Sequence, residues 1–234
     1  KSKNILDNQS NFAQINDIIK RQILDKQLED QLKKHIPVLG DLTDDVSNQV
    51  RGHYEENPYP LWLSITQPTE NNLLEYAESR LTGFDVKDIP QLTAPKVLVA
   101  GCGTGLLAIE HALRFPNSEV LGIDLSLASL AYAQRMADEM GLKKIKFIQA
   151  DIMQLDSLDE AFDFIECIGV FSHVADPVNS CQRLINKLSV NGVMRLSLYS
   201  DLARTQLQSA TVYAKKNNYN QTIESVREFR QVIL

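Results

Sequence analysis

Short apolar runs alternate with helical patterns from about residue 97 onward. The runs are rich in Val, Ile and Leu, which is typical of strands buried on both faces of a sheet. They lie at 97–99, 119–124, 145–151, 163–170 and 193–198. Between them, apolar residues recur at helical spacing, at 106–114, 127–140 and 181–188. Strands that alternate with helices imply right-handed crossovers, so we predict an α/β fold: a Rossmann-like parallel sheet with helices on both faces.

The first part of the chain has a different pattern. Over 12–36, apolar residues recur at helical spacing among charged and polar ones, which predicts a long amphipathic helix that Pro37 and Gly40 end. This helix either packs on the main domain or a neighbouring domain, or binds a specific partner. A further helix is predicted over 73–81, with Gly83 as its stop.

These patterns divide the chain into four parts. We expect an N-terminal helical segment (1–52), a lid with its helix (53–92), the sheet domain (93–200) and C-terminal helices (201–234). The last part contains helical patterns at 201–216 and 222–234. No sixth or seventh strand is predicted there, so the sheet domain is expected to be truncated.

The lid begins with an unusual segment from His53 to Trp62. It contains two prolines, two tyrosines and the only tryptophan of the chain. Prolines prevent regular structure, and we expect them to keep the preceding residues extended. The segment is either a rigid aromatic cover over a pocket or an ordinary turn whose aromatic side chains fill the core.

The first predicted strand runs into a glycine-rich turn, V-L-V-A-G-C-G-T-G, with Gly101, Gly103 and Gly105. Glycine lets the backbone turn sharply and approach a ligand closely. A strand, a glycine turn and a helix seat nucleotide-like ligands at the carboxyl end of a parallel sheet. Asp124 closes the next strand, about 20 residues beyond the glycines, where an acidic side chain meets ribose hydroxyls in dinucleotide folds. Asp151 closes the strand after that. Each carboxylate can instead cap the turn or helix that follows it.

Composition narrows the class of protein. A net charge of −6 indicates no surface for nucleic acid or an anionic membrane. No apolar run approaches the roughly 18 residues of a membrane span. The three cysteines are widely spaced, so we expect reduced thiols in a cytoplasmic protein and neither a disulfide frame nor a zinc site. No other cluster has metal-ligand spacing, and no metal is expected.

The glycine spacing departs from the G-x-G-x-x-G of dinucleotide dehydrogenases. A-G-C-G-T-G after a strand resembles instead the class I S-adenosylmethionine-dependent methyltransferases. The resemblance covers 96–199 and includes V-L-G-I-D-L-S, F-I-Q-A-D-I and F-D-F-I-E-C-I-G-V-F-S-H in the family's order. The segments E-N-P-Y-P-x-W, S-L-A-S-L-A-Y-A and M-R-L-S-L-Y-S-D-L-A-R are similar to bacterial methyltransferases often fused to tetratricopeptide repeats. No repeat is visible here, so a repeat region is expected outside this chain, connected through the N-terminal helices.

The resemblance implies a cofactor site for S-adenosylmethionine. The turn would approach the methionine part of the cofactor, and Asp124 would accept hydrogen bonds from both ribose hydroxyls. Asp151 would accept one from the exocyclic amine of adenine. The remaining residues implied are those of the turn (Gly101, Cys102, Gly103, Thr104, Gly105), those around the adenine (Leu125, Ile152) and those beside the sulfonium (Cys167, Ile168, Gly169).

One position departs from the family. Many members have an acidic residue two positions before the first glycine, where this chain has Val99. We consider Tyr54 or Asn57, from the lid, as replacements for that carboxylate in contacting the cofactor.

Catalytic candidates are fewer. His173 follows the fourth predicted strand and is either a general base or a residue that fixes the turn. Tyr59 and Tyr199 either orient the substrate or belong to the core. No N-P-P-Y motif follows the fourth strand, so amino methylation by that motif's chemistry is not indicated.

Two functions follow from these residues. The first is an enzyme that moves a methyl group from S-adenosylmethionine to a small molecule or a protein and leaves S-adenosylhomocysteine. The second is a module that binds the cofactor and serves regulation or assembly without catalysis of its own. The intact ribose and adenine positions favour the enzyme, whereas Val99 and the missing strands favour the module.

Overall fold

The computed structural model describes residues 13–40, 45–80, 86–220 and 222–233. Contacts divide the chain into two compact units, Lys1–Ser197 and Leu198–Leu234, and each is described by itself. The finer boundaries expected at 52 and 92 stay predictions. Within the described residues, no helix combines the length and the apolar character that crossing a membrane needs.

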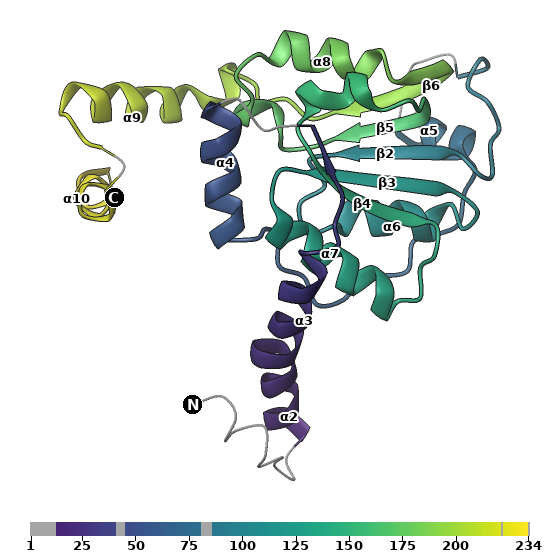
Figure 1. The fold of residues 1–234 in the computed structure, drawn as a ribbon. Helices are drawn as coiled ribbons and strands as arrows, with labels where there is room; N and C mark the ends of the chain where they lie inside the picture. Colours follow the sequence, from purple (N-terminus) through teal and green to yellow (C-terminus); the bar gives the residue numbers. More distant parts are fainter. Residues whose placement is uncertain (1–12, 41–44, 81–85, 221, 234) are drawn as a thin grey trace. The chain divides into compact units, whose positions relative to one another are not determined.

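The first unit contains a six-stranded sheet in the order β1-β4-β3-β2-β5-β6, in which every neighbouring pair is parallel (Figure 1). This confirms the predicted α/β fold. The strands are β1 (Val38–Leu39), β2 (Lys96–Ala100), β3 (Glu119–Asp124), β4 (Ile145–Ala150), β5 (Phe162–Cys167) and β6 (Leu188–Leu196). The edge strand β1 is not predicted from the sequence, because two residues are too few for a periodic pattern.

Helices cover both faces of this sheet. Successive residues of a strand point to opposite faces, and β2 feeds two separate cores: Val97 and Val99 lie in one, and Leu98 and Ala100 in the other. The first core is shared with α5 (Leu73–Arg80), α6 (Leu106–Arg114) and α7 (Leu127–Glu139). The second is shared with η2 (Ile152–Ser157), η3 (Phe171–His173) and α8 (Pro177–Ile185).

The N-terminal helix is shorter than predicted. It consists of α2 (Ala13–Ile19), a π-helical stretch η1 (Lys20–Leu24) and α3 (Asp25–Leu32). The turn after Leu32 then leads into β1, which pairs with β4. The start of the predicted helix, and the Gly83 stop of α5, lie outside the described residues.

The expectation of extended backbone before the prolines is wrong for His53 to Glu56. These residues form the last turn of α4 (Asp45–Glu56). Proline disfavours the helical conformation only for the residue directly before it. Here that residue is Asn57, which follows the end of the helix.

The fifth predicted strand and the helix before it are also displaced. α8 begins at Pro177 because Asp176 caps it, accepting a hydrogen bond from the Asn179 N–H at 3.0 Å. β6 then begins at Leu188 and includes Asn191, which has a φ of 62°. The predicted turn at Asn191 is therefore an irregularity inside a strand, where the pairing with β5 shifts register.

The second unit is helical, as the pattern predicted. It contains η4 (Leu202–Arg204), α9 (Thr205–Lys216) and α10 (Ile223–Ile233), and none of its described residues forms a strand. Phe229 of α10 packs on Tyr213 of α9 and on Tyr219, with ring centroids 6.4 and 5.2 Å apart. These aromatic contacts hold the two helices of the unit together.

Candidate functional site

The glycine turn lies between β2 and α6 and is closely packed. Gly103 and Gly105 have φ values of 53° and 81°, which side chains rarely tolerate. A Cβ on Gly103 would lie 2.6 Å from the carbonyl oxygen of Tyr59, and one on Gly105 would lie 2.5 Å from Cβ of Ala133. The turn therefore needs glycine both for its backbone conformation and for the close approach of its neighbours.

Asp124 at the end of β3 faces this turn. One of its carboxylate oxygens accepts the N–H of Gly103 at 2.8 Å, and the other accepts the N–H of Ser126 at 2.9 Å. Burial raises the pKa of Asp124, although the same backbone hydrogen bonds act in the opposite direction. Each oxygen has a second lone pair, so the carboxylate keeps acceptor capacity after it has oriented the turn.

The end of α4 lies over the same edge of the sheet. The Ser126 hydroxyl contacts the Tyr54 carbonyl at 3.0 Å, and Glu55 accepts the Ala128 N–H at 3.0 Å. The Tyr54 ring lies edge-on to His173, with ring centroids 6.4 Å apart. Two residues that the sequence singled out separately therefore meet at the carboxyl edge, one from α4 and the other from η3.

The lid segment contacts the turn through its backbone and its tryptophan. The Trp62 indole N–H donates to the Thr104 carbonyl at 3.1 Å, and the Thr104 hydroxyl donates to the Pro60 carbonyl. Trp62 is buried, whereas the Tyr59 side chain is 69% exposed. Trp62 therefore fills the core, as the second interpretation of the segment expects, and Tyr59 faces solvent. The cover over a pocket stays a prediction.

The residues that follow β3 and β4 are a carboxylate, Asp151, and two apolar side chains, Leu125 and Ile152. Asp151 accepts the Met153 N–H at 2.9 Å and so caps η2. Ile152 is buried next to it, and Leu125 is half-buried, with its carbonyl accepting from Gln149 at 2.7 Å. These residues lie where adenine contacts are predicted, at the carboxyl ends of β3 and β4.

β5 ends in a position open to solvent. Gly169 is exposed with a φ of 74°, and apart from its two chain neighbours no described residue has an atom within 4 Å of the place a Cβ would take. Ile168 is half-buried and Cys167 fully buried. Burial raises the pKa of Cys167 to about 12, so its thiol stays protonated at neutral pH and is no nucleophile.

The residues from 93 to 232, more than half of the chain, match the family described as "Methyltransferase domain". The chain belongs to this methyltransferase family. The match includes every strand from β2 to β6, the glycine turn and Asp124. With the parallel sheet and the order of motifs, this makes the chain a class I S-adenosylmethionine-dependent methyltransferase domain, and S-adenosylmethionine is the cofactor of that class.

Three bacterial proteins illustrate what this methyltransferase domain is similar to. It is 29% identical to the uncharacterized protein syc1184_c of Synechococcus, over 71% of this chain and 40% of the relative. It is 39% identical to a ubiquinone biosynthesis O-methyltransferase of Alkalilimnicola ehrlichii, over 40% of this chain and 38% of the relative. The solved structure of PKMT2 from Rickettsia typhi has a TM-score of 0.54 at 27% identity and covers 68% of this chain and 30% of its own. The chain thus spans well under two-thirds of the length of these proteins.

The residues at the carboxyl edge fit the cofactor of this family. A nucleoside needs an acceptor for its ribose hydroxyls, and Asp124 has lone pairs left after its two backbone hydrogen bonds. A closely bound methionine part would need a backbone with few side chains; the turn has glycine at three alternate positions, and Gly169 is exposed after the end of β5. At the first glycine of the turn, Gly101, the Val170 side chain from the end of β5 packs against the place that a Cβ would take.

The contacts of two predicted site residues, Asn57 and Tyr199, and of Val99, which replaces the family's acidic residue, are as follows. The Asn57 side chain donates to the His53 carbonyl at 3.4 Å and closes the end of α4. Tyr199 belongs to the second unit, where the Arg204 guanidinium lies over its ring. Val99 is buried in the core of the methyltransferase domain, in register with Gly122 on one side and Glu166 on the other.

Sequence reasoning missed a buried polar group around Glu166. This side chain is fully buried; it accepts from the Arg195 guanidinium at 2.7 Å and lies 2.5 Å from Nε2 of His111. Burial opposes ionisation of Glu166, but the hydrogen bond from His111 and the charges of His111 and Arg195 outweigh it and lower the pKa. An acidic residue inside the apolar run of β5 is the signal that could have indicated it.

Proposed function

We propose that this chain transfers a methyl group from S-adenosylmethionine to a small-molecule or protein acceptor, leaving S-adenosylhomocysteine. The observation that carries the proposal is the hydrogen bond between Asp124 and the Gly103 N–H. It brings the ribose acceptor and the glycine turn together at the carboxyl edge, where ligands of parallel α/β sheets bind. Family membership supports methyl transfer. What we propose in addition is the acceptor class, a small molecule or a protein.

The cofactor supplies the chemistry, a methyl group on a positively charged sulfur that an acceptor atom attacks in line. The chain's own residues hold the reactants in that geometry, which can lower a barrier by several kcal/mol. Asp124 and the glycine turn hold the nucleoside and the amino acid part. The open position at Gly169 leaves room for the acceptor to approach.

His173 is our candidate for a base when the acceptor atom carries a proton at neutral pH. It is exposed at the end of η3 and lies against Tyr54. We propose that Tyr54 and His173, whose rings lie against each other, contact the acceptor together from one side. Tyr59, exposed on the lid, is a second candidate for contacting the acceptor. The roles predicted from the sequence for Tyr199, in orienting the substrate, and for Asn57, in contacting the cofactor, stay proposals.

The alternative is a module that binds the cofactor without catalysis. Incubation of the protein with a cell extract and cofactor carrying a labelled methyl group distinguishes the two. Label in a product, protein or small molecule, supports the enzyme and identifies the acceptor class. Tight cofactor binding with no labelled product in any extract supports the module.

The cofactor site is tested by Asp124→Asn. Two hydrogen bonds to a carboxylate contribute about 1.5–3 kcal/mol each, so affinity for S-adenosylhomocysteine should fall at least about tenfold in calorimetry. Asp163→Asn is the matched control, because Asp163 accepts the Lys96 N–H at 2.9 Å at the opposite end of the strands. Equal affinity for Asp124→Asn and the native protein would remove the ribose role from Asp124.

We further propose a cytoplasmic location, since all three cysteines are free thiols, as is typical of a reducing compartment. A link from the N-terminal helices to a repeat region outside this chain stays a prediction.

A further inference from the structure

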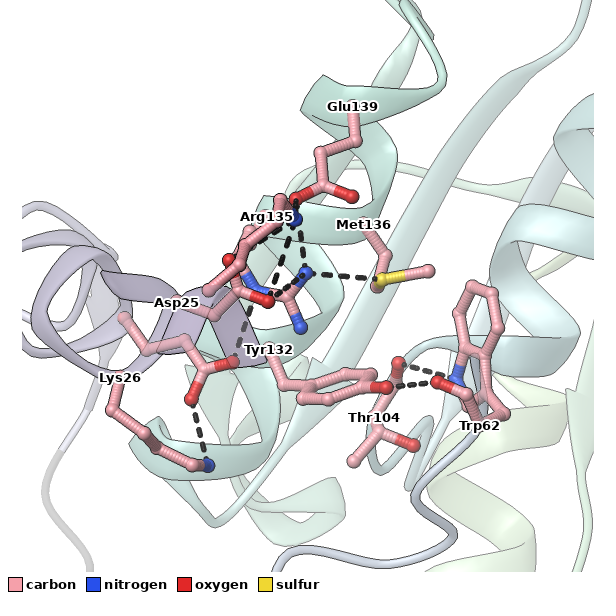
Figure 2. Close-up of polar contacts among 10 residues, drawn as sticks. Asp25, Lys26, Trp62, Thr104, Tyr132, Arg135, Met136 and Glu139 are labelled. Carbon is pink, nitrogen blue, oxygen red and sulfur yellow. Dashed lines mark hydrogen bonds and ion pairs between the residues drawn. The ribbon is translucent and has the colours of Figure 1, made fainter. Parts of the chain in front are cut away.

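A continuous series of contacts joins the N-terminal helix α3 to the glycine turn through α7 (Figure 2). It begins at Glu29 and ends at Thr104, whose carbonyl belongs to the turn. The steps are an ion pair, a cation–π contact and two hydrogen bonds. The predicted cofactor site uses the turn, but nothing in that prediction involves α3.

The first step is a buried ionic cluster between α3 and α7. Arg135 Nε lies 3.0 Å from a carboxylate oxygen of Glu29, and Arg135 Nη1 lies 3.1 Å from Glu139 and 3.7 Å from Asp25. Arg135, Glu29 and Asp25 are each less than 10% exposed. Removing one partner from such a cluster leaves an uncompensated buried charge, so α3 is held to α7 at this position.

The next two contacts, the cation–π contact and the first hydrogen bond, lead along α7 to the lid. The Arg135 guanidinium lies over the Tyr132 ring at 4.7 Å, since the two residues are one helical turn apart on the same face. The Tyr132 hydroxyl then donates to the Trp62 carbonyl, and the two rings meet edge to face at 6.1 Å. Arg135 thus orients the Tyr132 ring, and the Tyr132 hydroxyl in turn holds the backbone carbonyl of Trp62.

The last step reaches the turn. The Trp62 indole donates to the carbonyl of Thr104, a residue that is fully buried. Thr104 lies between Gly103 and Gly105, and its carbonyl belongs to the peptide that joins it to Gly105, so this hydrogen bond orients that peptide of the turn. On the same helix as Tyr132, Ala133 packs against Gly105. The turn is thus held from α7 both directly and through the lid.

We propose that Tyr132 and Trp62 are positioning residues for the glycine turn, and that docking of α3 on Arg135 sets how firmly they hold it. The N-terminal helix then controls cofactor affinity from outside the cofactor site. The proposal concerns the cofactor alone and does not depend on which acceptor is methylated.

Tyr132→Phe tests the proposal, with Tyr76→Phe as the matched control. Both tyrosines are buried, and each hydroxyl makes a hydrogen bond: Tyr132 donates to the Trp62 carbonyl, and Tyr76 accepts from the Arg195 guanidinium. Only the Tyr132 hydroxyl bonds a residue, Trp62, that itself bonds the glycine turn. The main readout is hydrogen exchange of the amides of 102–106 in the protein without cofactor. We expect exchange there to rise about fivefold in Tyr132→Phe and to stay within about twofold in Tyr76→Phe.

Two further readouts separate positioning from general loss of stability. Trp62 is the only tryptophan, so its fluorescence spectrum reports the loss of the Tyr132 contact directly. Affinity for S-adenosylhomocysteine should fall about fivefold in Tyr132→Phe and not in Tyr76→Phe. If both variants change exchange and affinity alike, Tyr132 is only structural and the proposal is overturned.

The contribution of α3 is tested by Glu29→Gln, with Lys26→Met as its control. Lys26 is exposed and pairs with Glu29 at 2.9 Å from the solvent side. Glu29→Gln should raise exchange of 102–106 about threefold and Lys26→Met should leave it unchanged. Native exchange in Glu29→Gln overturns the role of α3. These exchange measurements need no cofactor, so they are decisive even if the native protein fails to transfer methyl groups.

Discussion

Glu166 illustrates how one buried residue stabilises several elements. It lies on β5, contacts His111 on α6 and Arg195 on β6, and the same guanidinium reaches the Tyr76 hydroxyl on α5 at 3.3 Å. A buried carboxylate is costly unless its partners are well placed. Here both of its oxygens have a partner, so the group can be ionised inside the core.

The lowered pKa of Glu166 predicts a pH dependence of stability. Because its folded pKa lies below the ordinary glutamate value of 4.5, the carboxylate stabilises the fold above that pH, and this contribution is lost as the pH falls through the folded pKa. Glu166→Gln should cost about 3 kcal/mol at pH 7. It should also lose less stability than the native protein between pH 5 and about 3, measured by urea unfolding.

Glu110→Gln is the control for this measurement. Glu110 pairs with Arg114 at 2.6 Å near the surface, so its replacement should change stability by less than about 1 kcal/mol. If the unfolding free energies of Glu166→Gln and the native protein fall in parallel with pH, the carboxylate is not the group that titrates.

At the scale of elements, α7 connects the site to the rest of the molecule. Its first turn binds the end of α4, its middle packs against Gly105 and Trp62, and its last turns bind α3. The N-cap Ser126 accepts the Ser129 N–H at 3.1 Å, and its hydroxyl also contacts Tyr54. The same residue therefore begins α7 and holds α4 over the carboxyl edge.

Ser126→Ala should show both roles. Loss of an N-cap costs about 0.5–2 kcal/mol, and release of α4 should also weaken the affinity for S-adenosylhomocysteine severalfold. Asp176→Ala removes the cap of α8, which takes no part in the predicted site, so it should cost similar stability without changing affinity. Thermal unfolding and calorimetry on both variants measure the two effects. Unchanged affinity in Ser126→Ala would mean that α4 does not shape the cofactor site.

At the scale of the whole molecule, the predicted cofactor residues all lie in the unit Lys1–Ser197. The segment that follows contains two highly exposed side chains, Leu198 at 67% and Leu202 at 88%. Exposed connections between compact units are preferred sites of proteolysis. We therefore expect cofactor binding to survive cleavage in this segment.

Limited digestion with chymotrypsin tests this division. We expect the earliest cleavage between 198 and 204, after Leu198, Tyr199 or Leu202, identified by mass spectrometry. The digested protein should retain its affinity for S-adenosylhomocysteine. A loss of affinity that follows the cleavage in time would assign part of the cofactor site to the second unit.

Much of this protein is determined by its sequence alone. The apolar runs predict five of the six strands and the parallel sheet, and α6 has the predicted bounds. The glycine turn and the position of Asp124 at a strand end can also be predicted, because both depend on residues that are neighbours in the sequence. These local signals are sufficient to predict the fold, and they indicate where the cofactor site is expected.

Only the tertiary structure decides which distant residues meet. The pairing of Glu29 with Arg135, of Trp62 with Thr104 and of Glu166 with His111 joins residues far apart in the chain. Such contacts depend on how helices pack on a sheet, and a periodic pattern identifies which face of a helix is buried but not what that face touches. The strand β1 belongs to this group too, because its two residues are a strand only through their pairing with β4.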